Sequence, residues 1–163
     1  MIYVTSDLHF FHTNIMKFCP VTRAGWSTVE DMNEGMIREW NKAVNCDDTV
    51  YILGDVCFGR VDNAIKLVKR LNGKKILIEG NHDSKMLKDP SYHSCFAEVH
   101  HYLELKYDGR FICMMHYPLS QWNKAHYGSL MLHGHCHGNL HHGEDASFYD
   151  NRRVIDVGCM LHD

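Results

Sequence analysis

The sequence predicts an α/β fold in which two β-sheets pack face to face and helices cover their outer sides. The first half of the chain alternates short β-branched runs with amphipathic helical stripes, which is the pattern of a parallel sheet with crossover helices. The second half contains closely spaced strand-like runs, which indicate a second, mixed sheet. The chain has 163 residues, of which 45% are hydrophobic, and this length is typical of one domain with its own core. We therefore expect a single domain over residues 1–163.

The first half is predicted to form the parallel sheet. Its expected elements are strands over residues 1–5, 49–53 and 75–78 and helices over residues 28–44 and 61–71. Ser27 and Glu30 have the spacing of a capping box, which marks the start of the first helix. Both helices repeat their apolar residues at helical spacing, as expected when one face packs on a sheet. Gly73 is predicted to cap the second helix at its C-terminal end.

The second half is predicted to form the mixed sheet. Its expected strands cover residues 102–107, 110–115, 130–132 and 153–157, and residues 138–151 are expected to form a surface loop. Asp108 and Gly109 separate the first two strands, and an Asp-Gly pair between strands is a strong signal for a tight hairpin turn. The sequence thus predicts a hairpin followed by two further strands.

The composition argues against a membrane protein and against stable nucleic-acid binding. The apolar runs are too short to span a bilayer, and the first residues lack the charged and apolar regions of a signal peptide. The net charge is −3, from 17 basic and 20 acidic residues, whereas binding to a nucleic-acid backbone requires a basic surface. The seven cysteines form no CxxC pair, which is typical of a reducing compartment. We therefore expect a cytoplasmic protein.

Histidine is unusually frequent, and several histidines stand just after predicted strands. The chain has 14 histidines, and imidazole is the commonest metal ligand in proteins. The motifs that follow strands are Asp7-x-His9, Gly54-Asp55, Gly80-Asn81-His82-Asp83, His116 and Gly134-His135-x-His137. Glycine precedes the donors in three of them and allows a sharp turn and a close approach. Because ligands of open α/β sheets lie beyond the carboxyl ends of the strands, we expect these motifs to converge on one metal site.

This ordered set of motifs resembles the calcineurin-like metallophosphoesterase superfamily over residues 2 to 137. The resemblance implies a four-layer αββα sandwich. It also implies two divalent cations that share a bridging carboxylate and a bridging water or hydroxide. The segments from Asp7 to His12 and from Gly54 to Gly59 are similar to those of the small members found in bacteria and their phages.

The resemblance also implies a role for each residue of the motifs. The implied ligands of the first metal are Asp7, His9 and His137, those of the second are Asn81, His116 and His135, and Asp55 is the implied bridge. His82 is expected to face the leaving group as a general acid or charge stabiliser. His12 is a candidate for contact with the substrate phosphate, because its loop starts at the edge of the metal site.

The donor types predict the metals. Carboxylate, amide and imidazole donors suit borderline-hard divalent ions, and no thiolate is needed. We expect two Mn²⁺ ions, with Fe²⁺, Zn²⁺ or Ni²⁺ as alternatives. Two such ions lower the pKa of a bridging water and clamp the phosphate oxygens. They also neutralise the phosphate, so a net charge of −3 is compatible with an anionic substrate.

The expected activity is hydrolysis of a small phosphate ester or nucleotide by a metal-bridging hydroxide. Phosphodiesters are favoured, because no segment is long enough to form a cap and Arg60 is the only nearby cation for a monoester dianion. Many family members carry Gly-Asp-x-x-Asp, but Phe58 stands at the second aspartate here, which argues against a protein phosphatase. The alternatives are a phosphomonoesterase or nucleotide phosphatase on the same metal centre and, in a different class, an inactive binding scaffold.

Overall fold

The computed structural model describes residues 1–140 and 153–158, which form two four-stranded sheets. The first sheet has the order β1-β2-β3-β4, and all of its neighbouring strands are parallel. Its strands are β1 (Ile2–Thr5), β2 (Thr49–Ile52), β3 (Lys74–Ile78) and β4 (Glu98–His100). The predicted parallel sheet is thus confirmed, and β4 extends it by a strand too short to show a pattern in the sequence.

The second sheet has the order β5-β6-β7-β8 and is mixed. Its strands are β5 (Tyr102–Tyr107), β6 (Arg110–Met115), β7 (Leu130–His133) and β8 (Val154–Asp156). Strands β5 and β6 are antiparallel, while β6-β7 and β7-β8 are parallel. The predicted hairpin is therefore confirmed. The predicted surface loop lies outside the described residues from residue 141 onward.

Helices α2 (Val29–Ala43) and α3 (Val61–Val68) are the two predicted amphipathic helices, but their ends differ from the prediction. The side chain of Thr28 caps α2 by accepting a backbone hydrogen bond, so the cap lies one residue later than Ser27. The prediction that Gly73 caps α3 is wrong. The chain tightens into i to i+3 turns just after α3, and Gly73, with a φ of +85°, makes the later turn into β3 instead.

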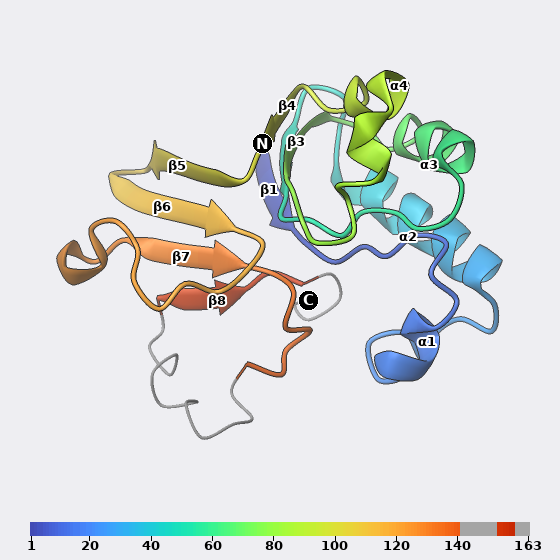
Figure 1. Cartoon of the computed structure of the whole chain (residues 1–163), viewed down its shortest axis with the longest axis horizontal. Coiled ribbons are helices and arrows are strands. Elements are labelled where there is room, and N and C mark those ends of the chain that lie inside the picture. The colour runs from blue at the N-terminus through green and yellow to red at the C-terminus, as the bar shows by residue number, and fades with distance from the viewer. Residues whose placement is uncertain (141–152, 159–163) are drawn as a thin grey trace.

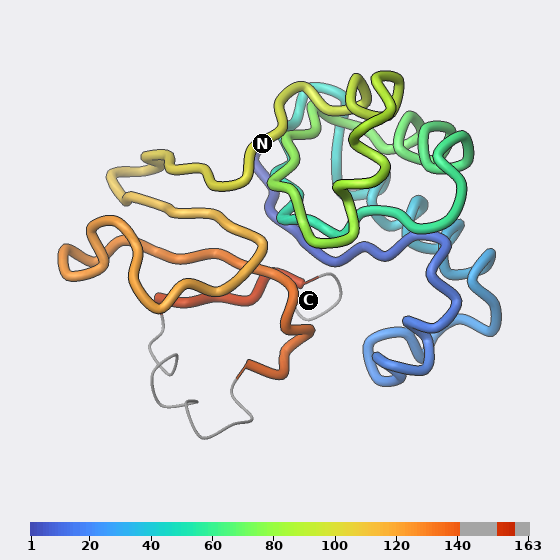
Figure 2. The backbone as a smooth tube through the Cα atoms, viewed as in Figure 1, coloured from blue at the N-terminus to red at the C-terminus, as the bar shows by residue number. Residues whose placement is uncertain are grey.

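Figure 1 shows the first sheet lying between the helices and the second sheet. Ile52 and Leu77 belong to the core on the helix side of the first sheet, whereas Ile78 and Met114 belong to the core between the two sheets. A smaller cluster that includes Trp122 forms a third core on the second sheet. Figure 2 shows that the blue-to-green first half and the yellow-to-red second half occupy separate sides of the molecule. The predicted architecture of two packed sheets flanked by helices is confirmed.

Four short elements have no clear signal in the sequence. They are α1 (Ile15–Phe18), α4 (Pro90–His93) and the 3₁₀ turns η1 (Met86–Lys88) and η2 (Ala125–Tyr127). Each is too short to repeat an apolar residue on one face, so periodicity cannot reveal it. No helix in the described part of the chain combines the length and the hydropathy needed to cross a membrane.

Candidate metal centre

The predicted donors lie just beyond the ends of β1, β2, β3, β6 and β7. Backbone pairing continues past these strands: the amide of His9 donates to the Asp55 carbonyl (3.0 Å), and the amide of Gly134 donates to the His116 carbonyl (3.0 Å). These hydrogen bonds hold together turns that are far apart in the sequence. The structure therefore brings the five motifs to one place.

Asp7, His9 and His137 form the first group of donors. The Nε2 atom of His9 lies 3.6 Å from Asp7 Oδ1 and 3.2 Å from His137 Nε2, and His137 Nε2 lies 3.8 Å from Asp7 Oδ1. Two ligands that bind one ion at about 2.1 Å, with an angle of roughly 90–130° between them, lie roughly 3.0–3.8 Å apart, so this spacing fits a shared cation. Asp7 Oδ1 is buried and accepts no hydrogen bond within the described residues, which leaves it available to a cation.

Asn81, His116 and His135 gather at a second position. The Oδ1 atom of Asn81 lies 2.9 Å from His116 Nε2 and 3.1 Å from His135 Nδ1. The ring of His116 is fully buried, and its Nδ1 lies 2.7 Å from the Leu53 carbonyl oxygen. A hydrogen bond to this carbonyl places the proton on Nδ1 and leaves the Nε2 lone pair facing the site, as in many metal-binding histidines.

The carboxylate of Asp55 stands between the two groups. Its Oδ2 lies 3.8 Å from His9 Nε2, and its Oδ1 lies 3.7 Å from His116 Nε2. Asp55 also forms, with Asp7 and His116, a second set of donors that could hold an ion. Each Asp55 oxygen thus faces a different group, which is the arrangement that a bridging carboxylate needs.

Five of the predicted ligands have a left-handed backbone. Their φ angles lie between 49° and 68°, and they are Asp7, His9, Asp55, His135 and His137. Non-glycine residues in this region cost up to about 1–3 kcal/mol each, and such residues cluster at functional sites. The fold therefore maintains these sharp turns although each costs conformational free energy. The turns direct the side chains toward one point.

Gly54 and Gly134 leave room where backbone segments approach one another. A Cβ added to Gly54 would lie 2.5 Å from His116 Nδ1 and 2.6 Å from the Cα of Gly80. A Cβ added to Gly134 would collide with the side chains of Ser6 and Asp7. The prediction that these glycines permit a close approach is confirmed at both positions.

Burial favours the protonation states that metal ligands need. Loss of solvation lowers the pKa of His12, His135 and His137, so these rings are neutral at pH 7. Burial acts to raise the pKa of Asp7, but interactions with His9, Ser6 and nearby imidazoles outweigh this effect and lower it. The site therefore combines an ionised carboxylate with neutral imidazoles, both of which can donate a lone pair to a cation.

His82 and His12 lie at the edge of the site and belong to neither donor group. The backbone amide of His82 donates to Asp55 Oδ1 (3.0 Å), and its Nε2 lies 3.9 Å from Asp55 Oδ2. Its side chain is 46% exposed, so the ring is accessible to a ligand bound at Asp55. The ring of His12 stacks on Phe58 with centroids 4.1 Å apart and lies 5.4 Å from the ring of His9.

Asp83 connects the Gly54-Asp55 turn to the Gly80 turn by hydrogen bonds, a role that could not be recognised in the sequence. Its buried carboxylate accepts hydrogen bonds from the backbone amides of Asp55 (2.8 Å), Val56 (3.0 Å) and Gly80 (2.9 Å). Burial raises the pKa of Asp83 to about 6, against the lowering effect of these hydrogen bonds. The carboxylate is therefore ionised at pH 7. Its place at the end of the Gly80 motif is the only signal in the sequence.

We expect Asp83→Ala to lower the free energy of unfolding by at least about 3 kcal/mol. The substitution leaves three buried amides without their acceptor, and each unsatisfied group costs about 1–3 kcal/mol. Asp83→Asn keeps one carbonyl oxygen and is expected to lose less. Urea unfolding with and without added Mn²⁺ measures both effects, and Asp47→Ala at an exposed position is the control. Equal unfolding midpoints for Asp83→Ala and the control would contradict this role.

Two residues between α1 and α2 contact the predicted ligands, and the sequence did not predict either contact. The Sγ atom of Cys19 lies 3.6 Å from His137 Nδ1. The buried guanidinium of Arg23 donates to the backbone carbonyl of Asp7 (2.9 Å). Neither residue belongs to a recognisable motif, so only the folded chain reveals these contacts.

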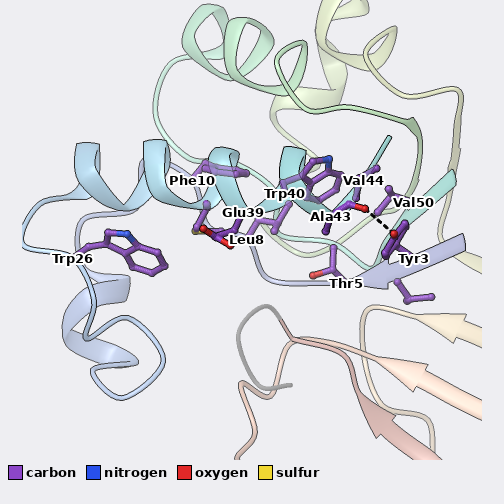
Figure 3. Close-up of a pocket in the computed structure, with 12 residues that line it drawn as sticks. Tyr3, Thr5, Leu8, Phe10, Trp26, Glu39, Trp40, Ala43, Val44 and Val50 are labelled. Atoms are coloured by element: carbon purple, nitrogen blue, oxygen red, sulfur yellow. Dashed lines mark hydrogen bonds between the residues drawn. The ribbon is translucent and has the colours of Figure 1, made fainter. Parts of the chain in front are cut away.

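A separate apolar cavity of about 250 Å³ lies between β1 and α2 (Figure 3). Its lining includes Trp26 and Trp40, and Glu39 is its one acidic residue. The hydroxyl of Tyr3, which also lines the cavity, donates to the Ala43 carbonyl (2.7 Å). None of the predicted metal ligands lines this cavity, so it is not part of the candidate centre.

The chain is similar to several known proteins. A family model described as calcineurin-like phosphoesterase matches residues 1–159. An uncharacterized protein of Methanocaldococcus jannaschii is 34% identical over 98% of this chain and 82% of its own length. The Gene 66 protein of Mycobacterium phage L5 is 27% identical over 96% of this chain and 84% of its own length. A protein of unknown function from Aquifex aeolicus has a similar structure, with a TM-score of 0.70, 27% identity and coverage of 97% of this chain and 89% of its own.

These findings agree with the donor groups assembled at the strand ends. The family model spans all of the described residues, and the phage relative agrees with the predicted resemblance to small phage members. The two groups of Asp and His donors indicate a divalent metal centre. The chain therefore belongs to the calcineurin-like phosphoesterase family, and it is a metal-dependent phosphoester hydrolase.

Proposed function

We propose that this protein is a manganese-dependent phosphodiesterase. The preference for diesters rests on the two nearby arginines, Arg60 and Arg23, which both contact other protein groups. Arg60 is turned toward Asp62, with 3.8 Å between Nη2 and Oδ2, and its side chain is 82% exposed. Arg23 is buried, and it donates to the Asp7 carbonyl and to the sulfur of Met36. A monoester dianion carries more negative charge than a diester and needs a further cationic donor at the reacting phosphate, which neither arginine supplies. Lys85 and Lys88 line the cavity beyond His82 and are not among the metal donors.

In this proposal the donors keep the roles that the family resemblance implies. Asp7, His9 and His137 would hold one ion, Asn81, His116 and His135 would hold the other, and Asp55 would contact both. When bound, the two ions supply a nucleophile from water and neutralise the phosphate oxygens. The spacing of the donor atoms and the two facing oxygens of Asp55 support this assignment. Oxygen and nitrogen donors without a thiolate support Mn²⁺.

His82 is proposed as the proton donor to the leaving group. Hydrolysis breaks the P–O bond to the leaving oxygen, attaches an oxygen from water to phosphorus and transfers a proton to the leaving oxygen. The exposed ring of His82 beside Asp55 supports this role. His12 is proposed to contact the substrate phosphate. Phe58 packs against both rings, at 4.1 Å from His12 and 4.7 Å from His82 between centroids, and holds them at the edge of the site.

The test compares bis-p-nitrophenyl phosphate with p-nitrophenyl phosphate at one pH and with one metal at a time. We expect kcat/KM for the diester to equal or exceed that for the monoester, and we expect Mn²⁺ to be among the best activators. Chelation with EDTA is expected to abolish activity, and Mn²⁺ to restore it. A clear preference for the monoester would replace this proposal with a phosphomonoesterase. No hydrolysis of either ester with any divalent metal would indicate an inactive scaffold.

A further inference from the structure

A second cavity begins at His82 and extends away from the metal donors. Its volume is about 570 Å³, which is within the range of small-ligand sites. One wall comes from the loop after β2 and the start of α3, and the other from the segment around η1. The lining residues are Cys57, Phe58, Gly59, Val61, His82, Lys85, Met86, Lys88 and Asp89.

We propose that this cavity is the leaving-group subsite and that it takes a nucleotide leaving group, one that carries a phosphate of its own. The proposal rests on the proposed function, because it takes His82 as the proton donor. It goes further by naming the chemistry of the group that leaves.

The position of His82 connects the cavity to the reaction. A proton donor must come within hydrogen-bond distance of the leaving oxygen, so the rest of the leaving group begins beside the His82 ring. On one side, His82 Nε2 lies 3.9 Å from Asp55 Oδ2. On the other side, the same residue lines the cavity. The group attached to the leaving oxygen therefore lies next to this cavity and can enter it.

Two lysines supply the charge that a second phosphate needs. Lys85 and Lys88 are exposed and line the cavity. They are three residues apart at a 3₁₀ turn, and residues with this spacing lie on the same side of such a turn. The lysine ion pairs within the described residues involve Lys42 and Lys74 instead.

Asp89, the acidic residue in the lining, forms no ion pair with either lysine in the described part of the chain. The Oδ1 atom of Asp89 accepts hydrogen bonds from the amides of Ser91 (2.8 Å) and Tyr92 (3.3 Å) at the start of α4. Its carboxylate is therefore engaged with the helix end, while the two ammonium groups remain available to an anion.

The remaining walls suit the apolar face of a base or sugar. Val61 and Met86 contribute aliphatic surface, and Phe58 contributes an aromatic edge. The ring of Phe58 is held in place by its packing on His12 and His82. Apolar walls that end at two cations match a nucleotide better than they match inorganic phosphate or an uncharged alcohol.

The experiment compares dinucleotides that differ only in a terminal phosphate, with bis-p-nitrophenyl phosphate as a diester that has no nucleotide leaving group. The substrates are thymidylyl-thymidine without a terminal phosphate, the same dinucleotide with a 5′-phosphate or a 3′-phosphate, and bis-p-nitrophenyl phosphate. We expect one of the terminal phosphates to raise kcat/KM of the wild-type protein with Mn²⁺ at least about tenfold, because a hydrogen bond between charged groups is stronger than one between neutral groups. The double variant Lys85→Met/Lys88→Met is expected to lose this gain and to hydrolyse bis-p-nitrophenyl phosphate within twofold of the wild type. Lys42→Met, at a side chain that is 80% exposed on α2, is the matched control.

A binding measurement gives a second readout that needs no turnover. Titration of the Mn²⁺-loaded proteins with thymidine 3′,5′-bisphosphate is expected to show about tenfold weaker binding to the double variant, while binding of inorganic phosphate stays unchanged. If the terminal phosphates do not change kcat/KM, and the double variant behaves like the wild type with every dinucleotide, the proposed subsite is wrong. The proposed phosphodiesterase activity is then unaffected. If the wild-type protein hydrolyses no diester, the proposed function fails, and the inference fails with it.

Discussion

Replacing Asp55 by asparagine is expected to lower both the affinity for metal and kcat/KM, each by at least about 100-fold. Loss of a residue that merely orients a ligand already costs about 10–100-fold in metal affinity or activity. Asp55 faces both donor groups directly, with its oxygens 3.8 Å from His9 Nε2 and 3.7 Å from His116 Nε2. An amide offers one neutral oxygen in place of two charged ones, so it cannot give each ion a carboxylate oxygen. Metal content of the purified variant and kcat/KM with bis-p-nitrophenyl phosphate measure the two effects.

The matched control for this variant is Asp47→Asn. Asp47 is exposed and belongs to neither donor group formed by the described residues, so the control should keep its metal content and full activity. A thermal unfolding curve shows whether Asp55→Asn still folds. Two tightly held ions and full activity in Asp55→Asn would end the bridging assignment.

His82→Ala is expected to keep its metals and to lose activity in a manner that depends on the leaving group. General acid catalysis raises the rate by about 10²–10⁴-fold and matters most when the leaving group is poor. The loss in kcat/KM should therefore be large with nucleoside or alkyl leaving groups and small with p-nitrophenolate. Metal analysis is expected to show no change, because His82 belongs to neither donor group formed by the described residues.

His101→Ala is the matched control for this substitution, because His101 is 84% exposed and pairs with Glu79. It should leave kcat/KM unchanged with every substrate. Equal losses in His82→Ala across all leaving groups would instead assign His82 a positioning role. A fall in metal content would make it a ligand.

The sequence predicted the long elements, and it singled out the motifs that the structure brings together at the strand ends. Strands β1, β2 and β3 and helices α2 and α3 show their period over enough residues to be recognised, and each donor follows a strand directly. Elements such as α1 and β4 were not predicted, because three or four residues cannot repeat a pattern. The cap of α2 and the end of α3 shifted, because the last turns depend on local hydrogen bonds that neighbouring residues can form equally well.

The sequence by itself determined which donor types reach the site, because residue type and position after a strand are both local properties. Only the tertiary structure decided which donors meet. Asp83 binds the amide of Asp55, Cys19 lies against His137, and His82 lines a cavity with Lys85 and Lys88. Contacts between turns far apart in the chain depend on the register of the parallel strands and on how the two sheets pack. Register and packing are set by the whole core at once, and no short motif encodes them.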